Sequence, residues 1–316
     1  MQKILILGLG AFGFAVAKHL GENNPDTTIY ASEINPEIYN SISDTRTHPY
    51  FFEGVKLPEN IELIADTQDF LPEVDIIISI IPCQFVGGAF SGMKEYLKSG
   101  VTILNLSKGI DNVSMQTVGE KLSEVLGGVR ISYAYLAGGM IAQELVDGTL
   151  LGADIVSESS KIGEKLTRLF QSDSLDIKLK ISPAKNTELY AALKNIIALI
   201  LGYYEGQGVG ASSRGYYLTK LLGEMKEVIT LLDGDSQIDF TDYALCGDLI
   251  ATCFGASRNR LLGNMLGEGK DITQALGELK AQNKIAEGYE TLKGVYKLTT
   301  GKAGFEEINK FGAIYL

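Results

Sequence analysis

The sequence ILILGLGAFGFAVAKHL, residues 4–20, decides the fold of this chain. Its first four residues form a continuous apolar run, which predicts a strand buried on both faces of a parallel sheet. The glycines of a GxGxxG pattern, Gly8, Gly10 and Gly13, follow directly, and a helical run begins among them. Gly8 permits a tight turn, Gly10 lets the backbone approach a pyrophosphate, and Gly13 lets the helix pack on the strand. A strand before the motif and a helix after it are the context that dinucleotide binding requires.

A carboxylate follows the next predicted strand, Thr28–Ser32. This residue is Glu33, about 20 residues beyond the glycines, where an acid would hold the ribose hydroxyls of the cofactor. A solvated carboxylate at the strand end is the alternative. No lysine or arginine follows until Arg46, so no nearby cation is placed to neutralise a 2′-phosphate. The pattern therefore favours NAD as the cofactor, with NADP as the second candidate.

Strand and helix signals continue to alternate through the first half of the chain. Further strands are predicted at residues 75–82, Val101–Leu106, Arg130–Leu136, Leu150–Val156 and Leu175–Ile181. This alternation predicts an α/β fold with a doubly wound, Rossmann-type sheet, whose ligands lie beyond the carboxyl ends of the strands. Lys108 and Gly138 fall at that edge, so both are candidates for substrate binding, although a lysine in such a place is often only solvated.

Beyond Pro183 the apolar period becomes helical. We therefore predict a dinucleotide-binding domain over 1–182 and an all-helical domain over 183–316. In the stretch from Leu189 to Leu201, only Lys194 and Asn195 interrupt an apolar run, which predicts a helix buried on all sides. An ammonium there is costly unless it is partnered or deprotonated. Lys194 is thus a candidate for proton transfer, and the alternative is a side chain that reaches a nearby surface.

A second polar group of residues occurs between 245 and 260. Asp248 and Thr252 are four residues apart and would share one helix face. Ser257 resembles a helix N-cap, which would place Arg258 and Asn259 at a helix N-terminus. A cation beside free backbone N–H groups makes a phosphate site. Each feature alone has an ordinary structural explanation, but together they suggest a phosphorylated substrate.

The composition narrows the classes of function. The chain has 316 residues, 45% of them hydrophobic, and a formal net charge of −11 with no block of lysines or arginines. The charge argues against a nucleic-acid partner and against an anionic membrane surface, and no long apolar segment suggests membrane insertion. The three cysteines form no CxxC pair and the two histidines are too few for a zinc site, so no metal is expected. The start lacks the features of a signal peptide, so we expect a cytoplasmic protein.

Several segments carry a specific resemblance. NLSKGID, ELYAALKNIIALILGYYEGQGVG, LCGDLIATC, ASRNR and AEGYETL resemble the ordered motifs of the NAD(P)-dependent sn-glycerol-3-phosphate dehydrogenases. The resemblance covers nearly the whole chain, from Gly8 to Glu287. It implies reversible hydride transfer between a nicotinamide and carbon 2 of dihydroxyacetone phosphate, in glycerolipid synthesis or redox balance.

The resemblance also implies roles for individual positions. It makes Lys194 the general acid/base, and the catalytic set that we predict from it is Lys194, Asp248 and Lys108. The predicted substrate contacts are Lys108, Gly138, Lys194, Asn195, Asp248, Thr252, Ser257, Arg258 and Asn259. To the cofactor contacts Gly8, Gly10, Gly13 and Glu33, the family pattern adds Ala11, Phe12, Lys108, Ala142, Arg258, Ile285 and Glu287.

Two other functions stay open. One is a related Rossmann reductase of a 2-keto acid, which would recognise a carboxylate and would not need the site at Arg258. The other is a module that senses NAD without turnover, which would predict a broken catalytic set. The expected partner is a small phosphorylated substrate, and a homodimer is the candidate assembly.

Overall fold

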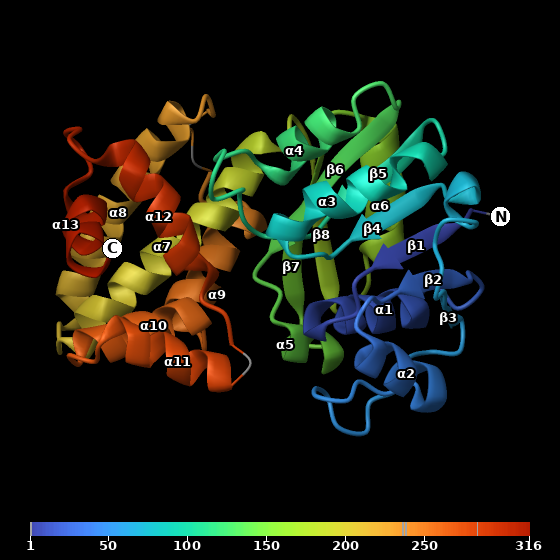
Figure 1. Cartoon of the computed structure of the whole chain (residues 1–316), viewed down its shortest axis with the longest axis horizontal. Coiled ribbons are helices and arrows are strands. Elements are labelled where there is room, and N and C mark those ends of the chain that lie inside the picture. The colour runs from blue at the N-terminus through green and yellow to red at the C-terminus, as the bar shows by residue number, and fades with distance from the viewer. Residues whose placement is uncertain (1, 236, 238, 283) are drawn as a thin grey trace. The chain divides into compact units, whose positions relative to one another are not determined.

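The computed structural model describes residues 2–235, 237, 239–282 and 284–316. Its contacts divide the chain into two compact units, which appear as the α/β part and the helical part in Figure 1. The first unit comprises Met1–Ser107 and Val118–Ala184, and the second comprises Lys108–Thr117 and Lys185–Leu316. This division differs from the predicted ranges 1–182 and 183–316, because the segment Lys108–Thr117 packs with the helices although it follows a strand of the sheet.

The first unit is built on one sheet. Its strands are β1 (Ile4–Leu7), β2 (Ile29–Ser32), β3 (Ile61–Leu63), β4 (Ile76–Ser79), β5 (Val101–Asn105), β6 (Ile131–Gly138), β7 (Leu151–Ser157) and β8 (Leu175–Ile181). The described strands lie in the order β3-β2-β1-β4-β5-β6-β7-β8, and only the β6–β7 pair is antiparallel. The order of the first six is that of a doubly wound dinucleotide-binding sheet, which confirms the predicted fold class.

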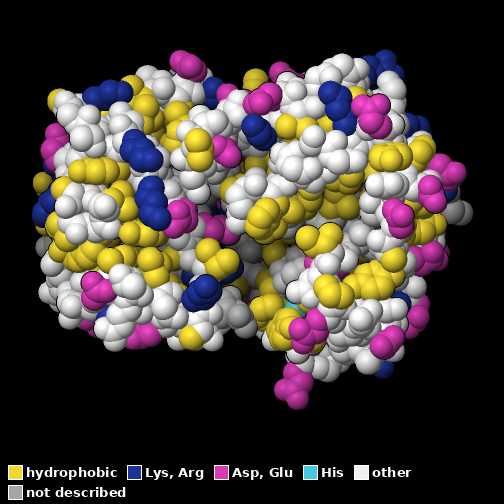
Figure 2. All heavy atoms as spheres, in the orientation of Figure 1, with side chains coloured by type: hydrophobic (Ala, Val, Ile, Leu, Met, Phe, Trp, Pro, Cys, Tyr) yellow, Lys and Arg dark blue, Asp and Glu magenta, His cyan; other side chains and the backbone are white. Residues whose placement is uncertain are grey.

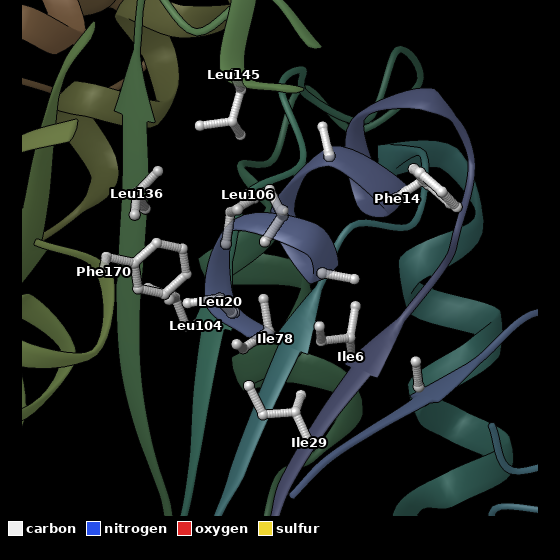
Figure 3. Close-up of a cluster of buried hydrophobic side chains, with 14 of the residues drawn as sticks. Ile6, Phe14, Leu20, Ile29, Ile78, Leu104, Leu106, Leu136, Leu145 and Phe170 are labelled. Carbon is white, nitrogen blue, oxygen red and sulfur yellow. The ribbon is translucent and has the colours of Figure 1, made fainter. Parts of the chain in front are cut away.

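Helices cover both faces of this sheet. They are α1 (Ala11–Asn23), α2 (Pro36–Thr45), α3 (Cys83–Met93), α4 (Val118–Val125), α5 (Ala142–Val146) and α6 (Ser160–Phe170). Alternate residues of β1 serve the two sides: Ile6 packs in the cluster with Phe14 and Phe170, whereas Leu5 packs in the cluster with Phe90. Figure 3 shows the first of these clusters, in which side chains of α1, α5 and α6 meet those of the strands. Burial on both faces explains the continuous apolar run of β1.

The second unit is helical and centres on α7 (Lys185–Gly206). The other helices are α8 (Ala211–Leu231), α9 (Asp248–Phe254), α10 (Arg258–Gly267), α11 (Ile272–Ala281), α12 (Glu287–Thr299) and α13 (Glu306–Tyr315), with a π-helical turn over Tyr243–Gly247 before α9. Helices α8, α9, α10 and α12 all contact α7, and residues from Thr187 to Gly202 are buried without interruption. The prediction of a helix surrounded on all sides is therefore confirmed.

Helices α7 and α10 touch backbone to backbone. A Cβ atom at Gly202 would lie 2.2 Å from the carbonyl oxygen of Arg260, and one at Gly263 would lie 2.0 Å from that of Leu199. Any side chain larger than hydrogen would force the helices apart at these positions. The same contact recurs one turn further along each helix, at Gly206 and Gly267.

Candidate functional site

The glycine-rich loop has the local geometry that its sequence predicts. Gly8 has a φ of +96°, and its N–H donates to the carbonyl oxygen of Ser32 at 2.9 Å. A Cβ at Gly13 would lie 2.0 Å from the Gly8 carbonyl oxygen, so the first turn of α1 is packed directly on the loop. By contrast, apart from Gly10 and its two chain neighbours, no described atom lies within 4 Å of the place that a Cβ would take at Gly10. The loop is therefore tight where the helix meets it and open at Gly10, which suits the approach of a pyrophosphate.

The Glu33 carboxylate is fixed beside this loop. One oxygen accepts a hydrogen bond from the Leu9 N–H at 2.7 Å, and the other accepts from the Asn35 N–H at 2.9 Å. Asn35 in turn caps α2, since its side chain accepts from the Glu37 N–H at 3.0 Å. Two backbone donors and a capped helix thus hold a negative charge next to the loop. The remaining lone pairs of the carboxylate can accept hydrogen bonds from hydroxyl groups.

The other predicted ligand contacts in the first unit are Ala11, Phe12, Ala142 and Gly138, and within the described residues they make no side-chain interaction that indicates a ligand. Ala11 and Phe12 begin α1 and are half-buried, and Ala142 begins α5. Gly138 ends β6 and is buried, and a Cβ there would lie 2.3 Å from the carbonyl oxygen of Gly152. The close pairing of β6 with β7 therefore accounts for glycine at position 138.

One buried carboxylate binds two lysines in the second unit. Lys194 lies in the middle of α7 and forms an ion pair with Asp248, the first residue of α9, and their side chains are only 4% and 3% exposed. Lys108, whose side chain is 23% exposed, places its Nζ 3.0 Å from Oδ1 and 2.9 Å from Oδ2 of Asp248. The three residues of the predicted catalytic set are therefore brought together, from positions far apart in the sequence.

Burial decides the protonation chemistry of this cluster. It lowers the pKa of Lys194 to about 7, with Asp248 opposing the decrease and Lys108 adding to it. Burial alone would raise the pKa of Asp248, but the two ammonium groups outweigh this effect and hold that pKa below its usual range. Asp248 therefore stays ionised while Lys194 can both give and take a proton near neutral pH.

Asn195 and Thr252 lie next to members of the cluster. Asn195 follows Lys194 on α7 and is buried. The Thr252 hydroxyl donates to the Asp248 carbonyl oxygen at 2.6 Å and lies 3.5 Å from its Oδ1, so both residues share one face of α9. Thr252 therefore stands at the edge of the buried charges, where a hydroxyl can also accept a hydrogen bond.

The N-terminus of α10 carries the predicted anion-binding residues. The Ser257 Oγ caps the helix by accepting from the Arg260 N–H, at 3.5 Å, and Arg258 is the exposed first residue. Asn259 is buried, and its Oδ1 accepts from the Gly288 N–H at 2.9 Å. Because that oxygen is occupied, the Nδ2 amide is the group that Asn259 can offer to a ligand. An exposed guanidinium, an amide donor and the first N–H groups of a helix together favour an anion.

The start of α12 supplies the last two predicted contacts. Ile285 is 63% exposed, and Glu287 is the exposed first residue of the helix. The cations that act on the Glu287 carboxyl are Arg258, Lys108 and Lys194. Glu287 is thus close enough to the cations of the cluster and of the α10 N-terminus to interact with them.

Sequence reasoning missed three features of this region. These are the Gly288 N–H that orients Asn259, and Glu205 and Arg260, which are paired beside the anion-binding turn. Arg260 stands within the ASRNR segment, but its partner is 55 residues away. A polar residue near the end of an otherwise apolar helix was the available signal for Glu205. In the described residues, no group of three or more His, Cys, Asp or Glu side chains could hold a metal ion.

The visible surface and the lengths of the helices bear on possible nucleic-acid and membrane contacts. Figure 2 shows basic side chains scattered singly or in small groups among other types on the face in view. None of the helices in the described part of the chain is long and apolar enough to cross a membrane.

A doubly wound sheet with this glycine loop defines the dinucleotide-binding class of α/β proteins. Residues 3–162 match the N-terminal part, and residues 184–315 the C-terminal part, of the NAD-dependent glycerol-3-phosphate dehydrogenases, so the chain belongs to this family.

Individual relatives are similar over nearly their full length. The chain is 29% identical to glycerol-3-phosphate dehydrogenase (NAD(P)+) of Nitratidesulfovibrio vulgaris strain Hildenborough over 298 residues, 94% of this chain and 88% of that protein. The glycerol-3-phosphate dehydrogenase structure from Coxiella burnetii has a TM-score of 0.86 at 22% identity, covering 100% of this chain and 95% of that one. The Saccharomyces cerevisiae enzyme gives 0.84 at 25% identity, with 99% and 94% covered.

Proposed function

We propose that this protein catalyses the reversible reduction of dihydroxyacetone phosphate to sn-glycerol 3-phosphate, with Lys194 as general acid/base. The observation that carries the proposal is the buried Lys194–Asp248–Lys108 cluster, in a chain of the glycerol-3-phosphate dehydrogenase family. A nicotinamide cofactor, when bound, supplies or accepts the hydride. The open loop at Gly10 and the fixed Glu33 carboxylate fit such a cofactor.

Proton transfer falls to Lys194. Reduction of a ketone needs a proton at the oxygen that becomes an alkoxide, and oxidation needs the same proton removed. With its pKa lowered to about 7, Lys194 can act in both directions near neutral pH. Asp248 holds the ammonium in place, and Lys108 adds a positive charge that favours a developing alkoxide.

Recognition of the substrate phosphate falls to the start of α10. Arg258, the Asn259 amide and the helix N-terminus form the anion site described above. A reductase of 2-keto acids would bind a carboxylate next to the reacting carbon, and a sensing module would need no proton donor. The intact buried lysine argues against the sensing module. Turnover of 2-keto acids tests for the keto-acid reductase.

The cofactor of choice is NAD. Two backbone N–H groups hold the Glu33 carboxylate, and its negative charge would repel the 2′-phosphate of a bound NADP. The family description names NAD, and the name of the Nitratidesulfovibrio vulgaris relative covers both NAD and NADP. We infer further that the enzyme is cytoplasmic, and a homodimer is the assembly to test by sedimentation.

The test is an absorbance assay at the nicotinamide band, run with NADH and NADPH in parallel. We expect turnover of dihydroxyacetone phosphate, little turnover of unphosphorylated dihydroxyacetone, and none of a panel of 2-keto acids. Arg258→Ala should lower kcat/KM for the phosphorylated ketone by about 10²–10³-fold and leave the weak activity on dihydroxyacetone nearly unchanged. Preferential turnover of a keto acid, or an equal loss on both ketones in Arg258→Ala, would contradict the proposal.

A further inference from the structure

Arg260 links the end of α7 to the turn that precedes α10. Its Nε and Nη2 donate to the two carboxylate oxygens of Glu205, both at 2.7 Å. Its Nη1 donates to the carbonyl oxygen of Gly255 at 3.0 Å. A bidentate arginine–carboxylate pair fixes direction as well as distance, so the guanidinium ties the Gly255 carbonyl to α7.

The backbone of Arg260 is held as firmly as its side chain. Its N–H is the one that the Ser257 cap accepts, and its carbonyl oxygen lies against Gly202, where no Cβ would fit. The Arg260 and Glu205 side chains are only 28% and 24% exposed, so water screens their attraction less than at an open surface. The segment 255–260 is therefore attached to α7 at two points, Glu205 and Gly202, and two hydrogen bonds within the segment tie its turn to Arg260.

We propose that Arg260 is a positioning residue of the substrate-phosphate site. By holding the Gly255 carbonyl, it would fix the turn that ends at Ser257, and with it the direction of Arg258 and the first N–H groups of α10. Each of its three guanidinium nitrogens already bonds within the second unit, so it would act through the turn rather than on the substrate. The inference rests on the proposed function and adds a residue to it.

Arg214 provides a matched control. Arg214 lies on α8, and its Nη1 donates to a carboxylate oxygen of Glu205 at 2.8 Å. Its side chain is 27% exposed, close to the 28% of Arg260. Its hydrogen bonds in the described part of the chain go to Glu205 and not to Gly255. A change at Arg214 therefore disturbs the same carboxylate but leaves the link to the turn intact.

The experiment compares Arg260→Lys with Arg214→Lys. A lysine at 260 keeps the charge but cannot make the bidentate contact and the carbonyl contact together. For each variant, kcat/KM is measured with dihydroxyacetone phosphate and with dihydroxyacetone, and the ratio of the two is the readout. We expect the ratio to fall about tenfold in Arg260→Lys and to change less than about twofold in Arg214→Lys. If Arg260→Lys does not fold, Glu205→Gln takes its place with the same expectation.

The outcomes separate a positioning role from a purely structural one. A structural role would lower the melting temperature and both activities together and leave the ratio unchanged, which overturns the inference. An equal fall of the ratio in both lysine variants overturns it as well. Failure of the proposed function gives a different result. The wild type would then show no preference for the phosphorylated ketone, or Arg258→Ala would not reduce that preference. Either result would overturn both proposals.

Discussion

Replacing Lys108 with methionine should raise the pKa that governs catalysis by Lys194. With both lysines protonated and Asp248 ionised, the cluster carries a net charge of +1, and loss of the Lys194 proton makes it neutral. Without Lys108, the protonated cluster is neutral, and the same loss leaves a buried negative charge. Deprotonation of Lys194 therefore becomes less favourable, and its pKa rises.

The size of the effect follows from the spacing of the charges. The Lys108 Nζ lies 3.0 Å from the oxygen of Asp248 that Lys194 also contacts, so the two ammonium groups are within about 6 Å of each other. At an effective dielectric constant of about 20, this repulsion is about 3 kcal/mol, or about two pKa units. Because the Lys108 side chain is 23% exposed, solvent screens part of it, and we expect a shift of at least about one unit.

The assay is the pH dependence of kcat/KM for oxidation of sn-glycerol 3-phosphate at saturating NAD. Oxidation needs neutral Lys194, so the rate should rise with pH through about 7 in the wild type, and reduction should fall over the same range. In Lys108→Met the rise of kcat/KM with pH, which we call the rising limb, should move to higher pH. The overall rate of this variant should also be lower. The substrate phosphate titrates near pH 6 in every variant, so only the difference between variants is interpreted.

A control variant tests whether the loss of any positive charge would shift the pH profile. Lys293 lies on α12 with its side chain 43% exposed and paired to Glu290, so Lys293→Met should leave the limb in place. A limb that stays fixed in Lys108→Met, or moves to lower pH, would refute the reasoning. It would mean that the titrating group is not Lys194 or that Lys108 does not act on it.

Three further outcomes are expected. Lys194→Met should lower kcat by about 10²–10⁴-fold and leave NADH affinity, measured by fluorescence titration, nearly unchanged; more than about a tenth of the activity remaining would assign proton transfer elsewhere. The wild type should use NADH with about ten- to a hundredfold higher kcat/KM than NADPH, and Glu33→Gln should narrow the gap, whereas equal use of both cofactors would show that this carboxylate does not discriminate. Gly263→Ala should lower the free energy of unfolding by about 1–3 kcal/mol in urea titrations, because the methyl group would meet the Leu199 carbonyl oxygen, whereas Gly277→Ala, in open space on α11, should raise it by up to about 1 kcal/mol.

Local patterns were sufficient to predict most of the fold. The strand before Gly8, the helix after it and the later apolar runs all lie where the sequence placed them, because strands buried on both faces read as continuous apolar segments. The edge strand Ile61–Leu63 was missed, since three residues are too few to display a period. The membership of Lys108–Thr117 in the helical unit was missed too, because it depends on packing between distant segments.

The sequence was sufficient to select Lys194, Asp248 and Lys108, which the structure brings together, but not to predict the pKa of Lys194. A lysine inside an apolar helix indicated a perturbed pKa, yet burial and the carboxylate shift it in opposite directions. Only the geometry shows that Lys108 shares the Asp248 carboxylate and adds to the lowering of the Lys194 pKa. The orientation of the Asn259 amide likewise depends on Gly288, which lies 29 residues further along the chain.

Under the proposed function, the crossing of α7 and α10 couples phosphate binding to proton transfer. Lys194 stands on α7 and Arg258 on α10, and the two helices meet at Gly202 and Gly263 with no side chain between them. These backbone contacts restrict changes in the spacing between the proton donor and the anion site. In a three-carbon substrate, the carbonyl is only a few bonds from the phosphate, so a phosphate held at Arg258 has few ways to place the ketone. A fixed spacing therefore converts the binding energy of the phosphate into orientation of the reacting carbon, and the effect appears in kcat as well as in KM.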